Sequence, residues 1–266
     1  MSDSRISKLF QGSPLGTEGH KILNVYCTAG YPTLDSTLTV MQALQDNGAD
    51  LIELGMPYSD PLADGPVIQA SSSTALANGM TIEILFQQLK GFRSGRRGIT
   101  VPVVLMGYMN PVLQFGFEKF CQYAADAPID GIILPDLPAY EFETEYREIL
   151  QRYGLDFIFL VTPETSEERV RKLDSLSTGF LYAVSSSATT GGNTNFDAVE
   201  QYLQRLQSYQ LNNPVLVGFG IKDKQTFDAA CKYANGAIIG SAYIKALEDA
   251  EDIETATKEF LGSIVQ

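Results

Sequence analysis

One stretch of the sequence decides the fold, Leu51-Ile-Glu-Leu-Gly-Met-Pro-Tyr-Ser-Asp-Pro-Leu-Ala-Asp-Gly-Pro-Val-Ile-Gln69. It begins as an apolar strand interrupted by Glu53, and a carboxylate in a buried strand is costly unless it faces a polar cavity. Pro66 then favours the start of a helix. The loop between them exceeds the roughly 2–6 residues usual between a strand and its helix, and long loops are often functional. We expect Glu53 near the exit of the strand, with Asp64 delivered above it by the loop.

The rest of the chain alternates apolar runs with amphipathic helical patterns. The apolar runs are nearly continuous, which is typical of parallel strands covered on both faces. The expected strands are Ile22–Ala29, Leu51–Gly55, Val101–Tyr108, Gly131–Pro135, Asp156–Val161, Gly179–Ser185, Pro214–Phe219 and Gly236–Gly240. The expected helices are Arg5–Gln11, Leu34–Asn47, Val67–Asn78, Ile82–Phe92, Phe117–Ala125, Glu141–Tyr153, Ser166–Ser175, Phe196–Tyr209, Lys222–Tyr233, Ala242–Glu248 and Ile253–Ile264.

Eight strand–helix units in a chain of this length predict an α/β fold, a single-domain (β/α)8 TIM barrel over residues 1–266. The barrel has an extra N-terminal helix, capped by Ser4, and a short helix after the eighth strand. A doubly wound open sheet is the alternative, but it more often has fewer strands and a glycine-rich turn after the first one. Thr28-Ala-Gly-Tyr-Pro32 is not a dinucleotide-binding fingerprint.

The composition excludes several classes of function. A net charge of −13 argues against nucleic-acid and membrane surfaces. Three widely spaced cysteines and the lack of a signal-peptide pattern or long apolar segment predict a cytoplasmic protein. The single histidine, His20, lies just before the first expected strand, which disfavours a histidine-based triad or a multi-histidine zinc site.

A phosphate site is predicted where the last strands end. Loops after the seventh and eighth strands of a barrel often bind phosphate, and here they read Gly218-Phe-Gly-Ile221 and Gly240-Ser241. Glycines let backbone N–H groups approach an anion, and Ser241 adds a hydroxyl donor ahead of a short helix. The loop Ser185-Ser-Ser-Ala-Thr-Thr-Gly-Gly192 supplies further small donors and the flexibility of a lid.

Missing residue types narrow the chemistry. No lysine lies within an expected strand or directly at its end, which disfavours a Schiff-base aldolase. The strand ends instead present carboxylates and tyrosines, namely Glu53, Asp64, Asp136, Tyr26, Tyr108 and Tyr182. Two carboxylates in different environments can divide acid and base roles, the more buried one having the raised pKa. We expect Glu53 to move protons and Asp64 to stay charged.

These residues resemble the tryptophan synthase α subunit family. The resemblance runs from Glu53 to Gln69 and continues through Thr28-Ala-Gly-Tyr-Pro32, Met106-Gly-Tyr-Met-Asn110, Leu134-Pro-Asp-Leu-Pro138, Gly218-Phe-Gly-Ile221 and Gly240-Ser241. It covers essentially the whole chain. It implies a lyase of tryptophan biosynthesis, which cleaves indole-3-glycerol phosphate to indole and glyceraldehyde 3-phosphate in a retro-aldol reaction.

The resemblance also implies the roles of individual residues. Glu53 matches the acid–base carboxylate of the family, and Asp64 matches the carboxylate that holds the indole N–H. The matched substrate-binding residues are Tyr26, Tyr182, Thr190, Gly191, Phe219, Gly220, Gly240 and Ser241. Among them, Tyr26 would pack on the indole and Thr190 would brace Asp64 when the lid closes.

The family's α subunit works in a heterotetramer, α2β2, with a β subunit that passes indole on to tryptophan. The resemblance implies no cofactor or metal in this chain, because the pyridoxal phosphate belongs to the β subunit. The expected docking residues are Pro57, Asp60, Asn110 and Pro138. The chain departs from the family at Ala188-Thr189, where Gly-Val is common, and at Ser186, where some members have Arg, so lid closure is the property most affected.

Two other hypotheses remain open. One is a different phosphosugar lyase or isomerase on the same barrel, using a magnesium ion held by Asp60, Asp64 and Asp136. The other is a barrel without catalysis that activates a partner enzyme. Chelation by EDTA distinguishes the first, and a Glu53→Gln variant with unaltered indole release would support the second.

Overall fold

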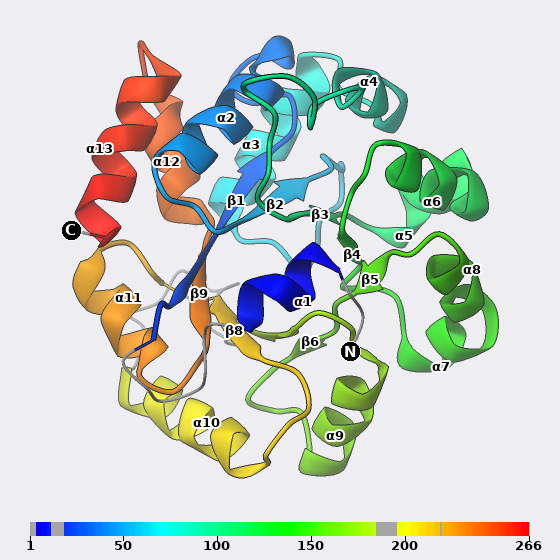
Figure 1. The fold of residues 1–266 in the computed structure, drawn as a ribbon, viewed down its shortest axis with the longest axis vertical. Coiled ribbons are helices and arrows are strands. Elements are labelled where there is room, and N and C mark those ends of the chain that lie inside the picture. The colour runs from blue at the N-terminus through cyan, green and yellow to red at the C-terminus, as the bar shows by residue number, and fades with distance from the viewer. Residues whose placement is uncertain (1–3, 12–18, 185–195, 219, 266) are drawn as a thin grey trace.

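The computed structural model describes residues 4–11, 19–184, 196–218 and 220–265. Its parallel strands form one sheet in the order β5-β4-β3-β2-β1-β9-β8-β7-β6, with helices packed around it (Figure 1). The strands are β1 (Ile22–Thr28), β2 (Leu51–Gly55), β3 (Val103–Met106), β4 (Gly131–Ile133), β5 (Asp156–Phe157), β6 (Leu160–Val161), β7 (Leu181–Val184), β8 (Val215–Gly218) and β9 (Gly236–Ile239).

The two ends of this strand order, β5 and β6, are consecutive pieces of the one strand predicted over Asp156–Val161. Ile158 N donates to Ile132 O beside β4, and Phe159 O accepts from Tyr182 N on β7. The fifth strand therefore joins both ends of the sheet, and the predicted barrel is confirmed.

The prediction of one unbroken fifth strand is wrong for a local reason. The amides of Phe157 and Phe159 donate to the side chains of Thr178 and Ser177, at 2.9 and 3.1 Å. Side-chain hydroxyls thus take the place of the neighbouring strand's carbonyls, which interrupts the regular ladder at this point.

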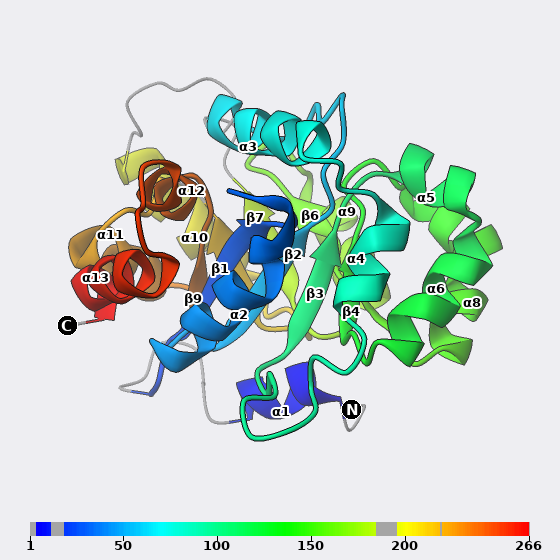
Figure 2. The same cartoon turned by 90° about the horizontal axis from the view of Figure 1, so that it is seen from above.

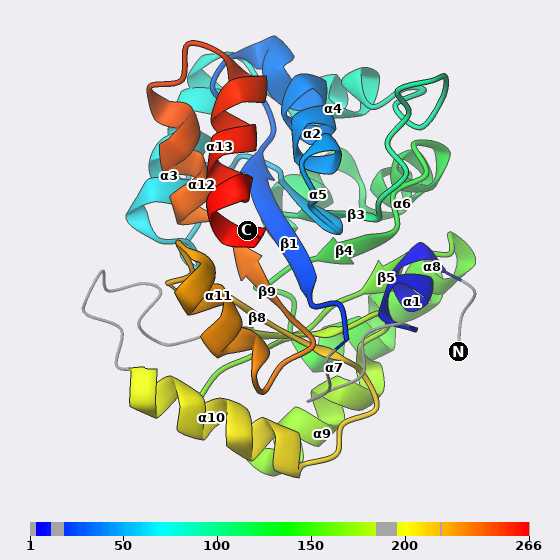
Figure 3. The same ribbon diagram turned by 60° about the vertical axis from the view of Figure 1, so that its left-hand side comes forward.

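Helices surround the barrel on its outside, and the first of them covers its amino end (Figures 1 and 2). They are α1 (Arg5–Phe10), α2 (Thr37–Asp46), α3 (Pro66–Ala77), α4 (Ile82–Gln88), α5 (Met109–Phe115), α6 (Phe117–Asp126), α7 (Ala139–Glu141), α8 (Arg147–Arg152), α9 (Glu167–Leu176), α10 (Phe196–Ser208), α11 (Lys224–Cys231), α12 (Ser241–Glu248) and α13 (Ile253–Val265). A 3₁₀ turn, Leu34–Ser36, precedes α2, and a π-helical segment, Phe142–Tyr146, joins α7 to α8. Helix α5 was not predicted. At the end of the chain, α13 packs against α2, α11 and α12 (Figure 3).

Strand burial agrees with the sequence pattern. Every residue of β1, β2 and β3 is buried, as expected for parallel strands covered on both faces. In register, Tyr26 of β1 lies beside Glu53 of β2, and Thr28 lies beside Gly55.

Among the helices of the described ranges, none combines the length and the apolar character that a membrane crossing requires.

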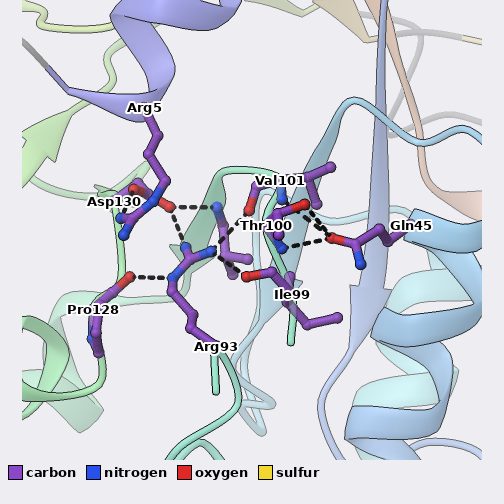
Figure 4. A network of polar contacts seen from close by, with 9 residues as sticks. Arg5, Gln45, Arg93, Ile99, Thr100, Val101, Pro128 and Asp130 are labelled. Atoms are coloured by element: carbon purple, nitrogen blue, oxygen red, sulfur yellow. Dashed lines mark hydrogen bonds and ion pairs between the residues drawn. The ribbon is translucent and has the colours of Figure 1, made fainter. Parts of the chain in front are cut away.

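The amino end of the barrel is covered by α1, whereas α3 lies at the opposite, carboxyl end (Figure 2). Ser4 caps α1, as predicted, and Ile6 of this helix is fully buried. A polar cluster below β3 and β4 fastens the helix (Figure 4). Arg5 and Arg93 both contact the carboxylate of Asp130, at 2.8 and 2.5 Å. The carboxyl end of the barrel is thereby left for the site.

Candidate active site

Glu53 is the central side chain of β2 and only 1% of its surface is exposed. Asn24 of β1 donates a hydrogen bond from Nδ2 to Glu53 Oε2 at 3.1 Å. Within the described part of the chain, Glu53 Oε1 has no hydrogen-bond partner. A buried carboxylate therefore lies inside the barrel with one oxygen held and the other unpaired.

Asp64 lies on the loop that follows β2 and is 9% exposed. A turn shapes the loop, because the Asp64 amide donates to Pro61 O at 3.0 Å. The Tyr108 hydroxyl, at the end of β3, donates to Asp64 Oδ2 at 2.9 Å and accepts from the Ala63 amide at 3.1 Å. Gln69 Nε2 donates to the Asp64 carbonyl at 2.8 Å. One hydrogen bond thus holds the carboxylate itself, and three hold the backbone around it beside the barrel mouth.

The two carboxyl groups have different pKa values for physical reasons. Burial raises the pKa of Glu53 to about 8, the hydrogen bond from Asn24 opposes this, and the charge of Asp64 adds to it. Burial raises the pKa of Asp64 to about 6, and the hydrogen bond from Tyr108 opposes that shift. At neutral pH the geometry therefore favours a protonated Glu53 and an ionised Asp64, a pair suited to proton transfer beside a fixed negative charge.

Two tyrosines share this space with the carboxylates. Burial raises the pKa of both Tyr26 and Tyr182, and the charges of Glu53 and Asp64 raise both further. Tyr26 lies over Gly55, where an added Cβ would collide with the tyrosine hydroxyl. Tyr182 lies over a second glycine, at the end of β8, in the same way. The glycines at the ends of these strands thus make room for aromatic rings inside the mouth of the barrel.

The expected phosphate-binding residues fall partly within the structure. Gly220 has a φ of 53°, in the left-handed region that glycine adopts without strain. Gly240 is the N-cap residue of α12, and Ser241 is the exposed first residue of that helix. The first N–H groups of a helix have no partner within it and favour an anion. The remaining predicted residues, Thr190, Gly191 and Phe219, lie outside the described residues, as do Ser186, Ala188 and Thr189.

The expected docking residues follow the ends of β2, β3 and β4. Asp60, Asn110 and Pro138 are exposed, and Pro57 is half-buried. Asn110 Nδ2 donates to the hydroxyl of Tyr58 at 3.1 Å, which links the loops after β2 and β3. Large apolar side chains are also exposed at this end, with Leu62 at 88% and Tyr140 at 72%.

The structure does not assemble the metal site of the magnesium hypothesis. Within the described residues, which include Asp60, Asp64 and Asp136, no group of three potential metal ligands forms. Both carboxylate oxygens of Asp136 instead accept from the Met109 amide, at 3.0 Å each, at the start of α5. This carboxylate caps a helix.

Two contacts of the site were not predicted. Asn24 belongs to a mostly apolar strand, and its position two residues before Tyr26, on the same inner face, is the only sequence signal for its role. Tyr108 was noted at a strand end, but its hydrogen bond to Asp64 joins residues 44 positions apart and has no local signal.

Comparisons with known proteins show the family to which the chain belongs. The profile of the family described as "Tryptophan synthase alpha chain" matches residues 14–264. The alpha chain of Flavobacterium johnsoniae is 51% identical over 248 residues, covering 93% of this chain and 96% of that one. The alpha chain of Parabacteroides distasonis is 46% identical over 264 residues, covering 99% of this chain and 100% of that one.

Solved structures agree with these sequences. The tryptophan synthase subunit alpha of Legionella pneumophila superposes with a TM-score of 0.87 at 33% identity, covering 99% of this chain and 97% of that one. A tryptophan synthase structure from M. tuberculosis gives a TM-score of 0.83 at 30% identity, covering 98% of this chain and 99% of that one. With the family profile matched over nearly all of its length, the chain belongs to the tryptophan synthase alpha chain family.

Proposed function

We propose that Glu53 and Asp64 carry out the reaction of this family, the cleavage of indole-3-glycerol phosphate to indole and glyceraldehyde 3-phosphate. Family membership supplies the activity, a carbon–carbon lyase step in tryptophan biosynthesis. The observation that supports the residue roles is the separation of the two pKa values, about 8 for Glu53 and about 6 for Asp64. One neutral and one charged carboxyl group suit the proton movements below.

In the first step, protonated Glu53 gives its proton to C3 of the indole ring. The positive charge that develops on the ring is stabilised by ionised Asp64 at the ring N–H. This electrostatic term is largest when the ring is charged, so it lowers the barrier more than it strengthens substrate binding.

In the second step, the Glu53 carboxylate takes the proton from the hydroxyl on the carbon bonded to C3. The electrons of the O–H bond form the aldehyde, and the electrons of the breaking C–C bond return to the ring. Indole and glyceraldehyde 3-phosphate result, and Glu53 is protonated again, so one side chain moves both protons.

We assign substrate binding to the residues around these carboxylates. Tyr26 and Tyr182 would bracket the indole ring, since both lie buried or half-buried beside the two charges. The phosphate would bind Gly220, Gly240 and Ser241, where the left-handed turn and the first N–H groups of α12 meet the requirements of an anion site. From the sequence alone we also assign substrate binding to Thr190, Gly191 and Phe219.

The partner follows from the family, whose alpha chain forms an α2β2 complex with a beta chain that carries the pyridoxal phosphate. For the docking surface we propose Pro57, Asp60, Asn110 and Pro138, beside the exposed side chains at the same end of the barrel.

We further propose one domain over residues 1–266, because a single cluster of buried apolar residues spans α1 to α13. We also propose that the protein is located in the cytoplasm. All three of its cysteines are buried free thiols, which suits a reducing compartment.

The test is indole release from indole-3-glycerol phosphate by the full chain, alone and with a beta subunit, in buffers with and without EDTA. We expect slow turnover alone, a large increase with the partner, and no effect of EDTA. Activity lost with EDTA would favour the magnesium-dependent phosphosugar enzyme. No indole release with the partner present would overturn the assignment of substrate.

A further inference from the structure

Asn24 approaches Glu53 from the side of the barrel opposite to the predicted substrate. In register it lies beside Leu51, one inward-facing position closer to the amino end than the pair Tyr26 and Glu53. Its side chain is fully buried, and its Nδ2 contacts Glu53 Oε2 at 3.1 Å. Asn24 therefore touches the reacting carboxyl group from below and has no access to the barrel mouth.

We propose that Asn24 is a positioning residue, which holds one oxygen of Glu53 and leaves the other to the substrate. The inference rests on the function proposed above. Its geometric support is that Glu53 Oε1 is buried without a hydrogen-bond partner among the described residues, while Oε2 is held. A buried acceptor without a partner is costly, and a substrate proton at Oε1 would remove that cost.

Asn24 also suits both protonation states of Glu53. A side-chain amide both donates and accepts, unlike any charged group. Asn24 Nδ2 donates to the carboxylate form, while Asn24 Oδ1 is itself buried without a partner within the described ranges. When Glu53 carries its proton on Oε1, Asn24 Nδ2 can still donate to Oε2, so the proton stays available to the substrate. The same side chain would then keep Glu53 in place throughout the proton cycle.

Other titratable groups act on Glu53 from the elements packed around it. The charge of Asp64, on the loop after β2, acts on Glu53, and the charge of Glu53 in turn raises the pKa of Tyr26 and Cys27 on β1 and of Tyr182 on β7. Asp64, with a pKa of about 6, is ionised at neutral pH and disfavours the charged form of Glu53. Asn24 is the hydrogen-bond donor that opposes this effect, so its removal should move the titration of Glu53 upward.

The test compares Asn24→Leu, which keeps the approximate shape and removes the hydrogen bond to Glu53, with Asn24→Asp, which keeps the shape and adds a second acid. The carboxyl of Glu53 is titrated by ¹³C NMR in the ligand-free full chain labelled at glutamate, and its signal is identified by its loss in Glu53→Gln. In parallel, kcat and KM are measured across pH with a beta subunit. Asn47→Leu is the matched control, because Asn47 caps the end of α2, where its side chain donates to Ala43 O.

We expect Asn24→Leu to raise the pKa of Glu53 by about one unit, because it removes a hydrogen bond to the charged form of the carboxyl group. The kcat should fall roughly tenfold, with KM within about twofold, because the contact acts on proton transfer and not on substrate binding. Asn24→Asp should raise the pKa of Glu53 further, since two neighbouring acids share one proton. Asn47→Leu should leave both the titration and kcat unchanged.

The proposal is overturned if Glu53 titrates as in the wild type in both Asn24 variants, or if kcat is unchanged. If Asn24→Leu fails to fold, as judged by circular dichroism, the isosteric Asn24→Asp variant decides by the same criteria. Should Glu53→Gln retain full activity, the proposed function fails on its own, whereas the titration still reports whether Asn24 holds Glu53.

Discussion

The Tyr108 hydroxyl lies 2.9 Å from Asp64 Oδ2 and donates a hydrogen bond to it, so the end of β3 holds a carboxylate that the loop after β2 supplies. The same hydroxyl accepts from the Ala63 amide, which fixes the loop next to that carboxylate. This bond opposes the effect of burial on Asp64, whose pKa is raised to about 6, whereas burial raises the pKa of Glu53 to about 8.

Tyr108→Phe removes this donor and should raise the pKa of Asp64. The acid side of the pH profile of kcat/KM should shift to higher pH by about one unit. This is the shift expected from loss of a hydrogen bond to a charged group. Activity at neutral pH falls, and recovers in part at higher pH. The control is Tyr209→Phe, whose ring lies near Arg171 far from the site. An acid limb at the wild-type position would show that Tyr108 does not act on Asp64.

The pH profile of the wild type follows from the two carboxyl groups. The reaction requires ionised Asp64, whose pKa is about 6, so kcat/KM should rise as the pH increases through that value. It also requires protonated Glu53, whose pKa is about 8, so kcat/KM should fall as the pH increases through that value. The resulting bell has its maximum near neutral pH and is measured from steady-state rates with a beta subunit. If kcat/KM only rises up to about pH 9.5, Glu53 does not have to be protonated at the start of the reaction, which contradicts its proposed role.

Most of the barrel could be predicted from the sequence because each strand is a continuous apolar run. The run over Asp156–Val161 shows the limit of this reasoning, since hydroxyls from Ser177 and Thr178 interrupt its ladder. Helix α5, Met109–Phe115, was missed because it is short and follows the strand directly. The cap that Asp136 provides to the Met109 amide comes from the next strand end, and no local pattern signals it.

The candidate site was predictable to the extent that its residues share one motif. Glu53 and Asp64 lie in a single stretch, so their proximity follows from a strand and its loop. The contacts of Asn24 and Tyr108 depend on the register between neighbouring strands and on the path of a loop. Neither can be derived from spacing along the chain, although both set the electrostatics of the carboxylates.

The glycine beneath Tyr26 gives a test of packing at the site. A Cβ at Gly55 would collide with the tyrosine hydroxyl and ring. Gly55→Ala should therefore displace Tyr26, raise KM, and destabilise the fold by about 1–3 kcal/mol, as overpacking does. Gly262→Ala is the control, because an added Cβ meets no atom there and alanine favours the helix. Urea denaturation and steady-state kinetics check both variants, and an unchanged KM for Gly55→Ala would exclude Tyr26 from substrate binding.

The polar cluster at the amino end should govern stability and not activity. Arg93 is nearly buried and contacts Asp130 together with the carbonyls of Pro128, Ile99 and Val101, at 2.8, 2.9 and 3.0 Å (Figure 4). Arg93→Met should therefore lower the free energy of unfolding by about 3 kcal/mol, since it leaves a buried carboxylate without its main partner.

Arg5→Met is the matched comparison, because Arg5 binds the same carboxylate of Asp130 but its side chain is 47% exposed. It should cost no more than about 1 kcal/mol. Neither variant should change kcat/KM at a temperature where both are folded. Equal losses of stability in the two variants would contradict the assignment of Arg93 as the main partner.

The most direct test of the account is indole release by Glu53→Gln in complex with a beta subunit. The amide keeps the shape of the side chain but cannot move a proton, so the rate should fall roughly 10²–10⁴-fold with KM little changed. Glu168→Gln, an exposed glutamate on α9, should retain the wild-type rate. A Glu53→Gln rate within about threefold of the wild type would contradict the central claim that Glu53 moves the protons.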